Sequence, residues 1–316
     1  MSGPSSATRG PRILLLGADG QLGWELRRAL LPLGELLAMG RTQADLGDVR
    51  AMRALLDRLR PGVVVNAAAY TAVDRAQSEP DLAHRVNAEG PALLADYAAA
   101  SGAWLLHYST DYVFDGSGTR PWRESDPTHP LGVYGRSKLD GEQAIRASAC
   151  RHLILRTSWV FAARGGNFAK TMVRLGCERE SLRVVADQVG APTSAELIAD
   201  LSALALHRLM REPELARANA GLYHLSSSGC TSWHGYACHV LSYVAQRGMS
   251  LRCDAAQVQP ITSAEYPAAA PRPANSRLDC EALRNWLGVW LPPWQPQVER
   301  MLEEAYGFGT DGLARG

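Results

Sequence analysis

A short apolar run near the amino terminus leads directly into a glycine-rich turn. The run is Arg12-Ile13-Leu14-Leu15-Leu16, and the turn is Gly17-Ala18-Asp19-Gly20-Gln21-Leu22-Gly23. Apolar residues then recur at helical spacing, at Leu22, Leu26, Ala29 and Leu30. A buried strand, a glycine turn and an amphipathic helix in this order predict the first unit of a parallel α/β sheet.

The glycine spacing is Gly-x-x-Gly-x-x-Gly, which differs from the usual Gly-x-Gly-x-x-Gly of dinucleotide-binding proteins. The physical features are the same: a tight turn, a close backbone approach to a pyrophosphate, and a helix amino terminus that faces negative charge. We therefore predict cofactor contacts at the turn, although a plain strand-to-helix turn would show the same pattern. The predicted residues are Gly17, Gly20, Gln21, Leu22 and Gly23.

Strand-like and helix-like patterns alternate through six units up to about residue 165. This alternation predicts a Rossmann-type doubly wound parallel sheet. We expect a disordered leader at 1–11, a dinucleotide-binding domain at 12–165 to which 187–226 returns, and a smaller mixed α/β substrate domain from 166–186 and 227–316.

Composition excludes several classes of function. The net charge is +1 with 21% charged residues, which gives no reason to expect a nucleic-acid or anionic membrane partner. No apolar run approaches the roughly 18 residues of a membrane span. The six cysteines include no Cys-x-x-Cys pair, and His234 and His239 near Cys238 lack a zinc-ligand spacing. Reduced thiols in a cytoplasmic protein are the expectation.

The predicted second strand ends at Gly40-Arg41-Thr42, beside the expected adenosine ribose. An Arg at this place suits a 2′-phosphate, so Arg41 favours NADPH over NADH as cofactor, although a solvated Arg is an alternative. Asp45 and Leu46 are near enough in sequence to reach the adenine, and an exposed loop Asp is an equal alternative. Small residues after the third strand, Ala68 and Ala69, would let a flat cofactor lie against the backbone.

Tyr134 and Lys138 stand four residues apart and would share one face of a helix. The chain has ten tyrosines and two lysines in 316 residues, so chance predicts about 10 × 2/316, or 0.06, such pairs. A nearby ammonium stabilises phenolate, so we expect Lys138 to lower the pKa of Tyr134 and make it a proton donor. A surface Tyr beside a solvated Lys is the alternative.

Polar residues follow the strands on either side of this helix. Ser109-Thr110-Asp111 ends the strand before it, and Thr157-Ser158-Trp159 ends the strand after it. Ligands bind at the carboxyl ends of parallel strands, so these residues are predicted to meet the glycine turn there. Simple turn chemistry would also explain the first trio.

Together these segments resemble the dTDP-4-dehydrorhamnose reductase family of extended short-chain dehydrogenases/reductases. The resemblance runs from Arg12 to about Tyr306. It is carried by the glycine turn, the Tyr134–Lys138 pair, and further segments at 66–74, 107–114, 167–172, 187–193, 272–278 and 291–294.

The resemblance implies that a nicotinamide cofactor reduces C4 of dTDP-4-dehydro-L-rhamnose, the last step of dTDP-L-rhamnose synthesis. Tyr134 would protonate the alkoxide, Lys138 would also hold the cofactor ribose, and Thr110 would hydrogen-bond the carbonyl oxygen. Tyr70 would join the cofactor contacts. Asp111 and Trp159 would contact the deoxysugar. The family also implies that Lys170, Arg272 and Arg277 face the diphosphate, although a surface basic run is an alternative for the two arginines.

Some members of this family form a homodimer around Mg²⁺ held by three glutamates. Glu25, Glu196 and Glu304 fall at the matching positions, and carboxylates suit a hard cation. Each alone would be interpreted as a solvated helix Glu. The resemblance thus implies a structural metal and a homodimer.

Two other functions fit the same fold. A sugar-nucleotide epimerase or dehydratase would share the superfamily, but a dehydratase needs an acid and a base, and Thr110-Asp111 offers only the acid. A non-catalytic regulatory subunit need not keep Tyr134, Lys138 and Thr110, which this chain has.

Overall fold

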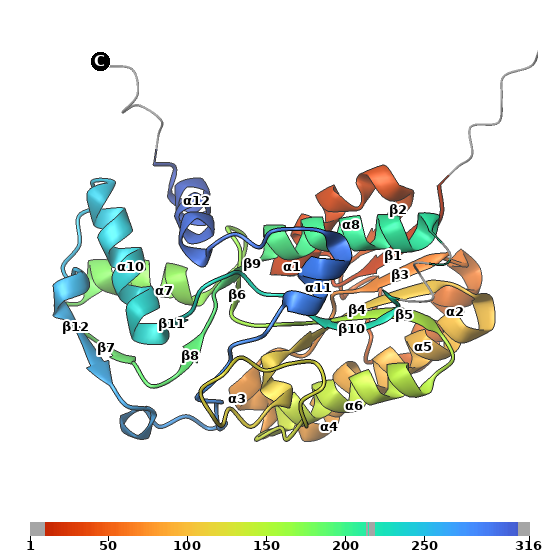
Figure 1. Cartoon of the computed structure of the whole chain (residues 1–316), viewed down its shortest axis with the longest axis horizontal. Helices are drawn as coiled ribbons and strands as arrows, with labels where there is room; N and C mark the ends of the chain where they lie inside the picture. The colour runs from red at the N-terminus through yellow and green to blue at the C-terminus, as the bar shows by residue number, and fades with distance from the viewer. Residues whose placement is uncertain (1–9, 213, 215–218, 309–316) are drawn as a thin grey trace, which may run out of the picture.

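The computed structural model describes residues 10–212, 214 and 219–308, and its centre is a six-stranded sheet (Figure 1). The strand order is β10-β5-β4-β3-β1-β2, and every adjacent pair is parallel. This confirms the predicted doubly wound parallel sheet. Of the predicted leader, only Gly10 and Pro11 lie among the described residues. The strands are β1 (Arg12–Leu16), β2 (Glu35–Met39), β3 (Val63–Asn66), β4 (Trp104–Thr110), β5 (Arg151–Thr157) and β10 (Gly221–His224).

Helices cover both faces of this sheet, and alternate residues of each strand explain why (Figure 1). Ile13 and Leu15 of β1 belong to one apolar cluster, with side chains of α1, α8 and α11. Leu14 and Leu16 belong to a second cluster, with side chains of α2, α5 and α6. Because both faces are buried, β1 has no polar alternation. These helices are α1 (Gln21–Ala29), α2 (Val49–Leu59), α5 (Gly90–Ser101), α6 (Val133–Ala147), α8 (Ala195–Arg211) and α11 (Glu281–Leu287).

The sequence pattern predicts one helix from about residue 80 to 101, and the structure is helical over this range with a π-helical turn in the middle. The segment consists of α4 (Pro80–His84), a π-helical turn η2 (Arg85–Glu89) and α5. Asn87 inside η2 accepts a hydrogen bond from Tyr70 N at 2.8 Å and donates to Tyr70 O at 3.0 Å. A wider turn of this kind often marks a functional site. The interruption fastens the loop after β3 to the helical layer.

A second lobe is formed by later segments around a third apolar cluster. Asn167 caps the first of its helices by accepting from Lys170 N, and Ser232 caps the second by accepting from Gly235 N. No helix in the described ranges is long and apolar enough to cross a membrane. The lobe contains α7 (Phe168–Glu178), β7 (Leu182–Val185), β8 (Val189–Gly190), β11 (Thr231–Ser232), α10 (Trp233–Gln246), β12 (Val258–Ile261) and α12 (Trp294–Tyr306), and β6 (Val160–Phe161) and β9 (Thr193–Ser194) lead into it.

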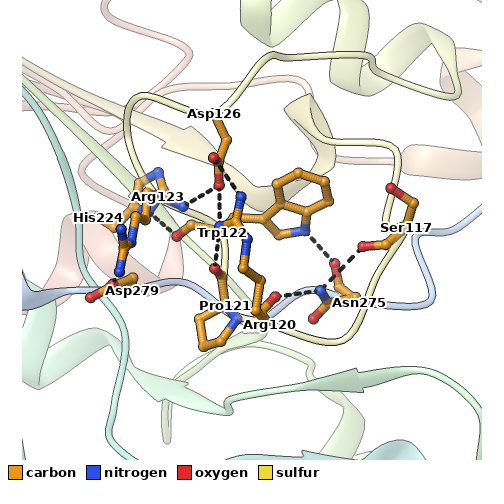
Figure 2. Close-up of polar contacts among 9 residues, drawn as sticks. All are labelled: Ser117, Arg120, Pro121, Trp122, Arg123, Asp126, His224, Asn275 and Asp279. Carbon is orange, nitrogen blue, oxygen red and sulfur yellow. Dashed lines mark hydrogen bonds and ion pairs between the residues drawn. The ribbon is translucent and has the colours of Figure 1, made fainter.

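A loop at 117–126 is bound to the returning segment at 275–279 (Figure 2). Trp122 N donates to Arg277 O at 2.8 Å, Asp279 N donates to Trp122 O at 2.8 Å, and the Trp122 indole donates to Asn275 O at 3.0 Å. Asn275 Nδ2 donates in turn to Arg120 O at 2.8 Å. These bonds hold the segment at 275–279 against the loop that follows β4.

Candidate active site

Tyr134 lies in the first turn of α6, where it faces the end of β4. Gly135 makes this approach possible, because a Cβ there would lie 2.1 Å from Tyr112 O. The Tyr134 and Tyr112 rings meet edge to face at 5.5 Å. The Tyr134 ring is partly exposed, but burial of its hydroxyl raises its pKa to about 12, against a lowering by the Thr110 hydroxyl. A phenol that stays protonated is suited to donate a proton.

Lys138 lies one turn further along α6 and is buried, with 2% of its surface exposed. Its ammonium donates to Tyr108 O at 2.7 Å and lies 3.3 Å from His107 Nε2. Burial lowers the pKa of Lys138 to about 8, and the nearby Glu142 carboxylate opposes this. The expectation that Lys138 brings the Tyr134 pKa toward neutrality differs from the structure, where burial dominates and the pKa rises.

Thr110 and Asp111 lie at the carboxyl end of β4, directly before the short turn η3 (Asp111–Val113). Thr110 Oγ1 donates to Asp111 Oδ1 at 3.0 Å and accepts from Tyr112 N at 3.2 Å. Asp111 is buried, and this burial raises its pKa to about 6, against lowering by the Ser276 and Thr110 hydroxyls. Among the described residues its Oδ2 atom has no hydrogen-bond partner. An unpaired acceptor atom in this position is available to a ligand hydroxyl.

The glycine turn has the bare backbone that a pyrophosphate needs. Gly17 has a φ of 75°, and a Cβ on it would lie 2.6 Å from Ala68 N. A Cβ on Gly23 would lie 2.0 Å from Gly17 O, so α1 could not begin so close to β1. Among the residues that the structure describes, no side chain caps α1, which begins at Gln21. Its free N–H groups therefore fit an anion, and a dinucleotide fits the turn.

The structure places the remaining predicted cofactor residues at the ends of β2 and β3. Arg41 is 76% exposed in its side chain and forms an ion pair with Asp45 at 3.4 Å. Leu46 differs from its neighbours: it is buried, and it packs so closely on Gly90 that a Cβ there would lie 2.4 Å from Leu46 Cγ. Its side chain is thus a core residue. Ala68, Ala69 and Tyr70 follow β3 as partly buried residues, and Tyr70 is held by Asn87 as described above.

Trp159 follows β5 in an unusual backbone conformation, with a φ of 49°. Its ring stacks on Trp233 of α10 with centroids 3.6 Å apart. Gly190 lies under the same indole, since a Cβ there would lie 2.6 Å from Trp159 Cε2. A non-glycine residue at positive φ is strained and commonly marks a functional site. The indole pair joins the end of the sheet to the second lobe.

The three cations expected near a diphosphate are each bonded within the chain. Lys170 Nζ donates to Ala163 O and to Gly165 O, both at 2.7 Å. Arg272 forms an ion pair with Asp74 at 2.7 Å. Arg277 lies in the segment at 275–279, and its Nε donates to Asn275 Oδ1 at 2.9 Å.

Glu25, Glu196 and Glu304 come close enough to influence one another. The pKa of Glu25 is raised, first by burial and then by the negative charges of Glu196 and Glu304. Arg300 forms an ion pair with Glu196 at 3.2 Å. Within the described ranges no group of three or more His, Cys, Asp or Glu side chains is placed to hold a metal ion.

Sequence reasoning missed several residues of this site. His107 and Asn66 contact or support Lys138, Ser276 lies beside Asp111, and Trp233 carries the Trp159 ring. A signal existed for the first two, because each is a polar residue in an otherwise apolar buried strand. Ser276 and Trp233 come from segments too distant in sequence for any local pattern to place them.

Comparison with known proteins agrees with this geometry. Residues 11–306 match the family described as RmlD substrate binding domain. A dTDP-4-dehydrorhamnose reductase of Salmonella typhimurium is 46% identical over 302 residues, 94% of this chain and 99% of that protein. The Escherichia coli K12 protein of the same name is 48% identical over 298 residues, 93% and 98% of the two chains.

Solved structures give the same relationship. The Bacillus anthracis dTDP-4-dehydrorhamnose reductase in complex with NADP superposes with a TM-score of 0.82 at 34% identity, covering 93% of this chain and 99% of that one. The Bordetella bronchiseptica enzyme WbmG in complex with NAD has a TM-score of 0.75 at 20% identity, covering 96% and 97%, which shows a shared fold.

Proposed function

The chain belongs to the dTDP-4-dehydrorhamnose reductase family, and we propose that it reduces the C4 keto group of dTDP-4-dehydro-L-rhamnose to give dTDP-L-rhamnose. The observation that carries this proposal is the meeting of Tyr134 with Thr110 at the end of β4, with Lys138 buried one turn behind. A protein that binds a sugar nucleotide without catalysis does not need two hydroxyls and an ammonium group in this arrangement.

The cofactor of this reaction is NADPH or NADH. A nicotinamide cofactor supplies the hydride when it is bound. Support comes from the uncapped start of α1 and from the close packing of Gly17 on Ala68, which suit a pyrophosphate. Related structures contain NADP and NAD. Arg41, exposed beside the end of β2, favours the 2′-phosphate of NADPH.

Proton transfer falls to the chain's own side chains. Tyr134, kept protonated by burial, gives its hydroxyl proton to the oxygen that forms at C4. Thr110 turns its hydroxyl toward this oxygen and stabilises the developing charge. Lys138 holds a cofactor ribose hydroxyl and, once the phenol has lost its proton, stabilises the phenolate.

The sugar and its diphosphate lie between the sheet and the second lobe in this proposal. Asp111 Oδ2, which lacks a partner among the described residues, accepts from a deoxysugar hydroxyl. Trp159 provides an apolar platform. Lys170, Arg272 and Arg277 supply positive charge to the diphosphate, so their present bonds within the chain must loosen or be shared. Residues 12–165 with 187–226 then form the cofactor domain, and 166–186 with 227–316 form the substrate domain, except that α11 packs on the sheet and β8 lies in the second lobe.

We further propose a cytoplasmic homodimer with Mg²⁺ at its interface. The negative charges of Glu196 and Glu304 raise the pKa of Glu25, and this repulsion among carboxylates supports a bound cation. The cation would relieve the repulsion when carboxylates of the partner subunit complete the ligand set. Six free cysteines in the described part of the chain support a reducing compartment. Sedimentation with and without EDTA tests the metal-linked dimer; an unchanged mass would contradict it.

The reductase assay follows NADPH absorbance with dTDP-4-dehydro-L-rhamnose as substrate. We expect the purified chain to oxidise NADPH in this assay, and no loss of nicotinamide absorbance would refute the proposal. Tyr134→Phe removes only the phenolic oxygen and its proton, so turnover should fall by a factor of at least about 100 while cofactor binding persists. Tyr112→Phe, a neighbouring ring, is the matched control. A near-normal rate for Tyr134→Phe would exclude it as the proton donor.

A further inference from the structure

His107 is a buried titratable residue that the proposed reaction does not use. It lies in β4, its surface is 0% exposed, and its ring faces α6. The Nε2 atom lies 3.3 Å from Lys138 Nζ, and the Nδ1 atom lies 3.0 Å from Asn66 Nδ2. The ring therefore bridges a side chain of β3 and the lysine of the active site.

The hydrogen bonds of Asn66 decide which ring nitrogen carries the proton. Ala68 N donates to Asn66 Oδ1 at 3.2 Å, so the amide oxygen is turned to the backbone and the Nδ2 group faces the ring. An amide NH₂ group can only donate, and His107 Nδ1 must therefore accept. Burial holds the pKa of His107 well below its usual range, so the ring is neutral. A neutral ring that accepts at Nδ1 carries its proton on Nε2.

This tautomer points an N–H group at Lys138. An ammonium has three donors and no acceptor, whereas a neutral amine has a lone pair that can accept. Lys138 Nζ already donates to Tyr108 O at 2.7 Å, a contact that either form can make. The contact with His107 is thus favourable only for the amine.

The other titratable groups near Lys138 lie on α6 and β4. On α6 itself, Tyr134 precedes it and Glu142 follows it, and the Glu142 carboxylate is shared with Arg156 of β5 through bonds of 2.8 and 2.6 Å. From β4, Tyr108 presents only its carbonyl, because its hydroxyl donates to Ser202 of α8. His107 is therefore the group from β4 whose N–H opposes the ammonium.

We propose that Asn66 and His107 act as positioning residues: Asn66 fixes the Nε2–H form of His107, and this N–H disfavours the ammonium form of Lys138. The inference rests on the proposed function, in which Lys138 serves the proton chemistry of Tyr134. The phenol gives up a proton in every turnover. A lysine that gains and loses its proton near neutral pH can return one to it.

The two-lysine composition makes a direct test possible. Protein labelled with nitrogen-15 in lysine and histidine should give one Nζ signal for Lys138 and one for Lys170, which serves as the internal control. We expect Lys138 to titrate near its pKa of about 8 and His107 to show an unprotonated Nδ1. Loss of one histidine signal set in His107→Phe gives the assignment. A protonated Nδ1 in the wild type would overturn the proposal.

Asn66→Asp is the informative variant. A carboxylate there accepts from Nδ1–H, so the tautomer should reverse, Nε2 should accept from the ammonium, and the Lys138 titration should move up by at least about one pH unit. An unmoved titration, or a rise without tautomer reversal, would refute the role assigned to His107. If the variant does not fold, the tautomer of His107 in the wild type still tests the proposal, because a protonated Nδ1 would refute it.

The kinetic readout follows from the same variant. The alkaline limb of the pH profile of kcat should move upward with the Lys138 titration, which a purely structural role of Asn66 would not produce. The nuclear magnetic resonance measurements need no substrate. They can therefore succeed even if the chain proves not to reduce the dTDP sugar, so the two proposals fail separately.

Discussion

Replacing Asp111 with Asn should make the protein more stable and less active. Asp111 is buried with 2% of its surface exposed, and one of its two carboxylate oxygens has no partner in the described part of the chain. Asn keeps an oxygen that can accept from Thr110 and removes the buried charge. The charge that disfavours folding is, in the proposed reaction, the group that holds the deoxysugar.

The size of the effect follows from the pKa of Asp111. Burial raises this pKa from 3.8 to about 6. The difference of about 2 pH units, at about 1.4 kcal/mol each, is about 3 kcal/mol. The pKa of Asp111 is higher in the folded state than in the unfolded state. The free energy of unfolding of the wild type is therefore at its full value below pH 3.8 and falls as the pH rises through about 6. The Asn variant has no such loss.

Urea unfolding of both proteins between pH 4 and 8 measures the difference. The variant should match the wild type near pH 4 and exceed it by up to about 3 kcal/mol at pH 7, while kcat/KM falls. Asp126→Asn is a control of opposite sign, since Arg120 lowers the pKa of Asp126 to about 2 and its stabilisation is complete above its ordinary pKa of 3.8. A stability difference for Asp111→Asn that is constant with pH would refute the reasoning.

Three further changes test other parts of the structure. Arg41→Asp should shift the kcat/KM preference from NADPH toward NADH, and an unchanged ratio would remove Arg41 from cofactor selection. Glu142→Gln keeps one acceptor oxygen but removes the counter-charge of the buried Arg156, and it should cost about 3–5 kcal/mol in urea unfolding, so a loss below about 1 kcal/mol would contradict a critical ion pair. Gly23→Ala places a methyl group 2.0 Å from a backbone carbonyl and should weaken NADPH binding at least about 10-fold. Gly166→Ala is its control, because a Cβ there would meet no described residue within 4 Å, and equal binding by both variants would count against a pyrophosphate site at the glycine turn.

The sheet was predictable because its signals are local. Each central strand is buried on both faces and reads as an apolar run, and the strand at 12–16 was predicted with the bounds that the structure has. The helix predicted at 80–101 has these outer bounds, but it contains a π-helical turn in which Asn87 bonds to Tyr70, 17 residues away. Tertiary hydrogen bonds of that kind leave no periodic trace in a sequence.

The sequence predicted where three candidate residues lie, and their roles in the reaction stay predictions. Tyr134, Lys138 and Thr110 stand at one edge of the sheet as expected, since parallel strands bring their carboxyl ends together. The direction of the Tyr134 pKa shift was not predictable, because burial depends on the segments that close over α6. Arg272 bonds to Asp74, and Arg277 bonds to Thr119 O besides Asn275, so each has a partner more than 100 residues away in the sequence.

The strand order also determines how long β5 waits for its outer neighbour during translation. β5 ends at Thr157, but its outer neighbour β10 begins at Gly221, so the 63 residues 158–220 separate them. At about 5–20 residues per second, a ribosome takes roughly 3–13 s to deliver β10 after β5. Through that interval an apolar strand edge stays open to pairing with other nascent chains. Slow translation between these strands should therefore favour aggregation, and chaperones that shield strand edges should matter most for this protein in those seconds.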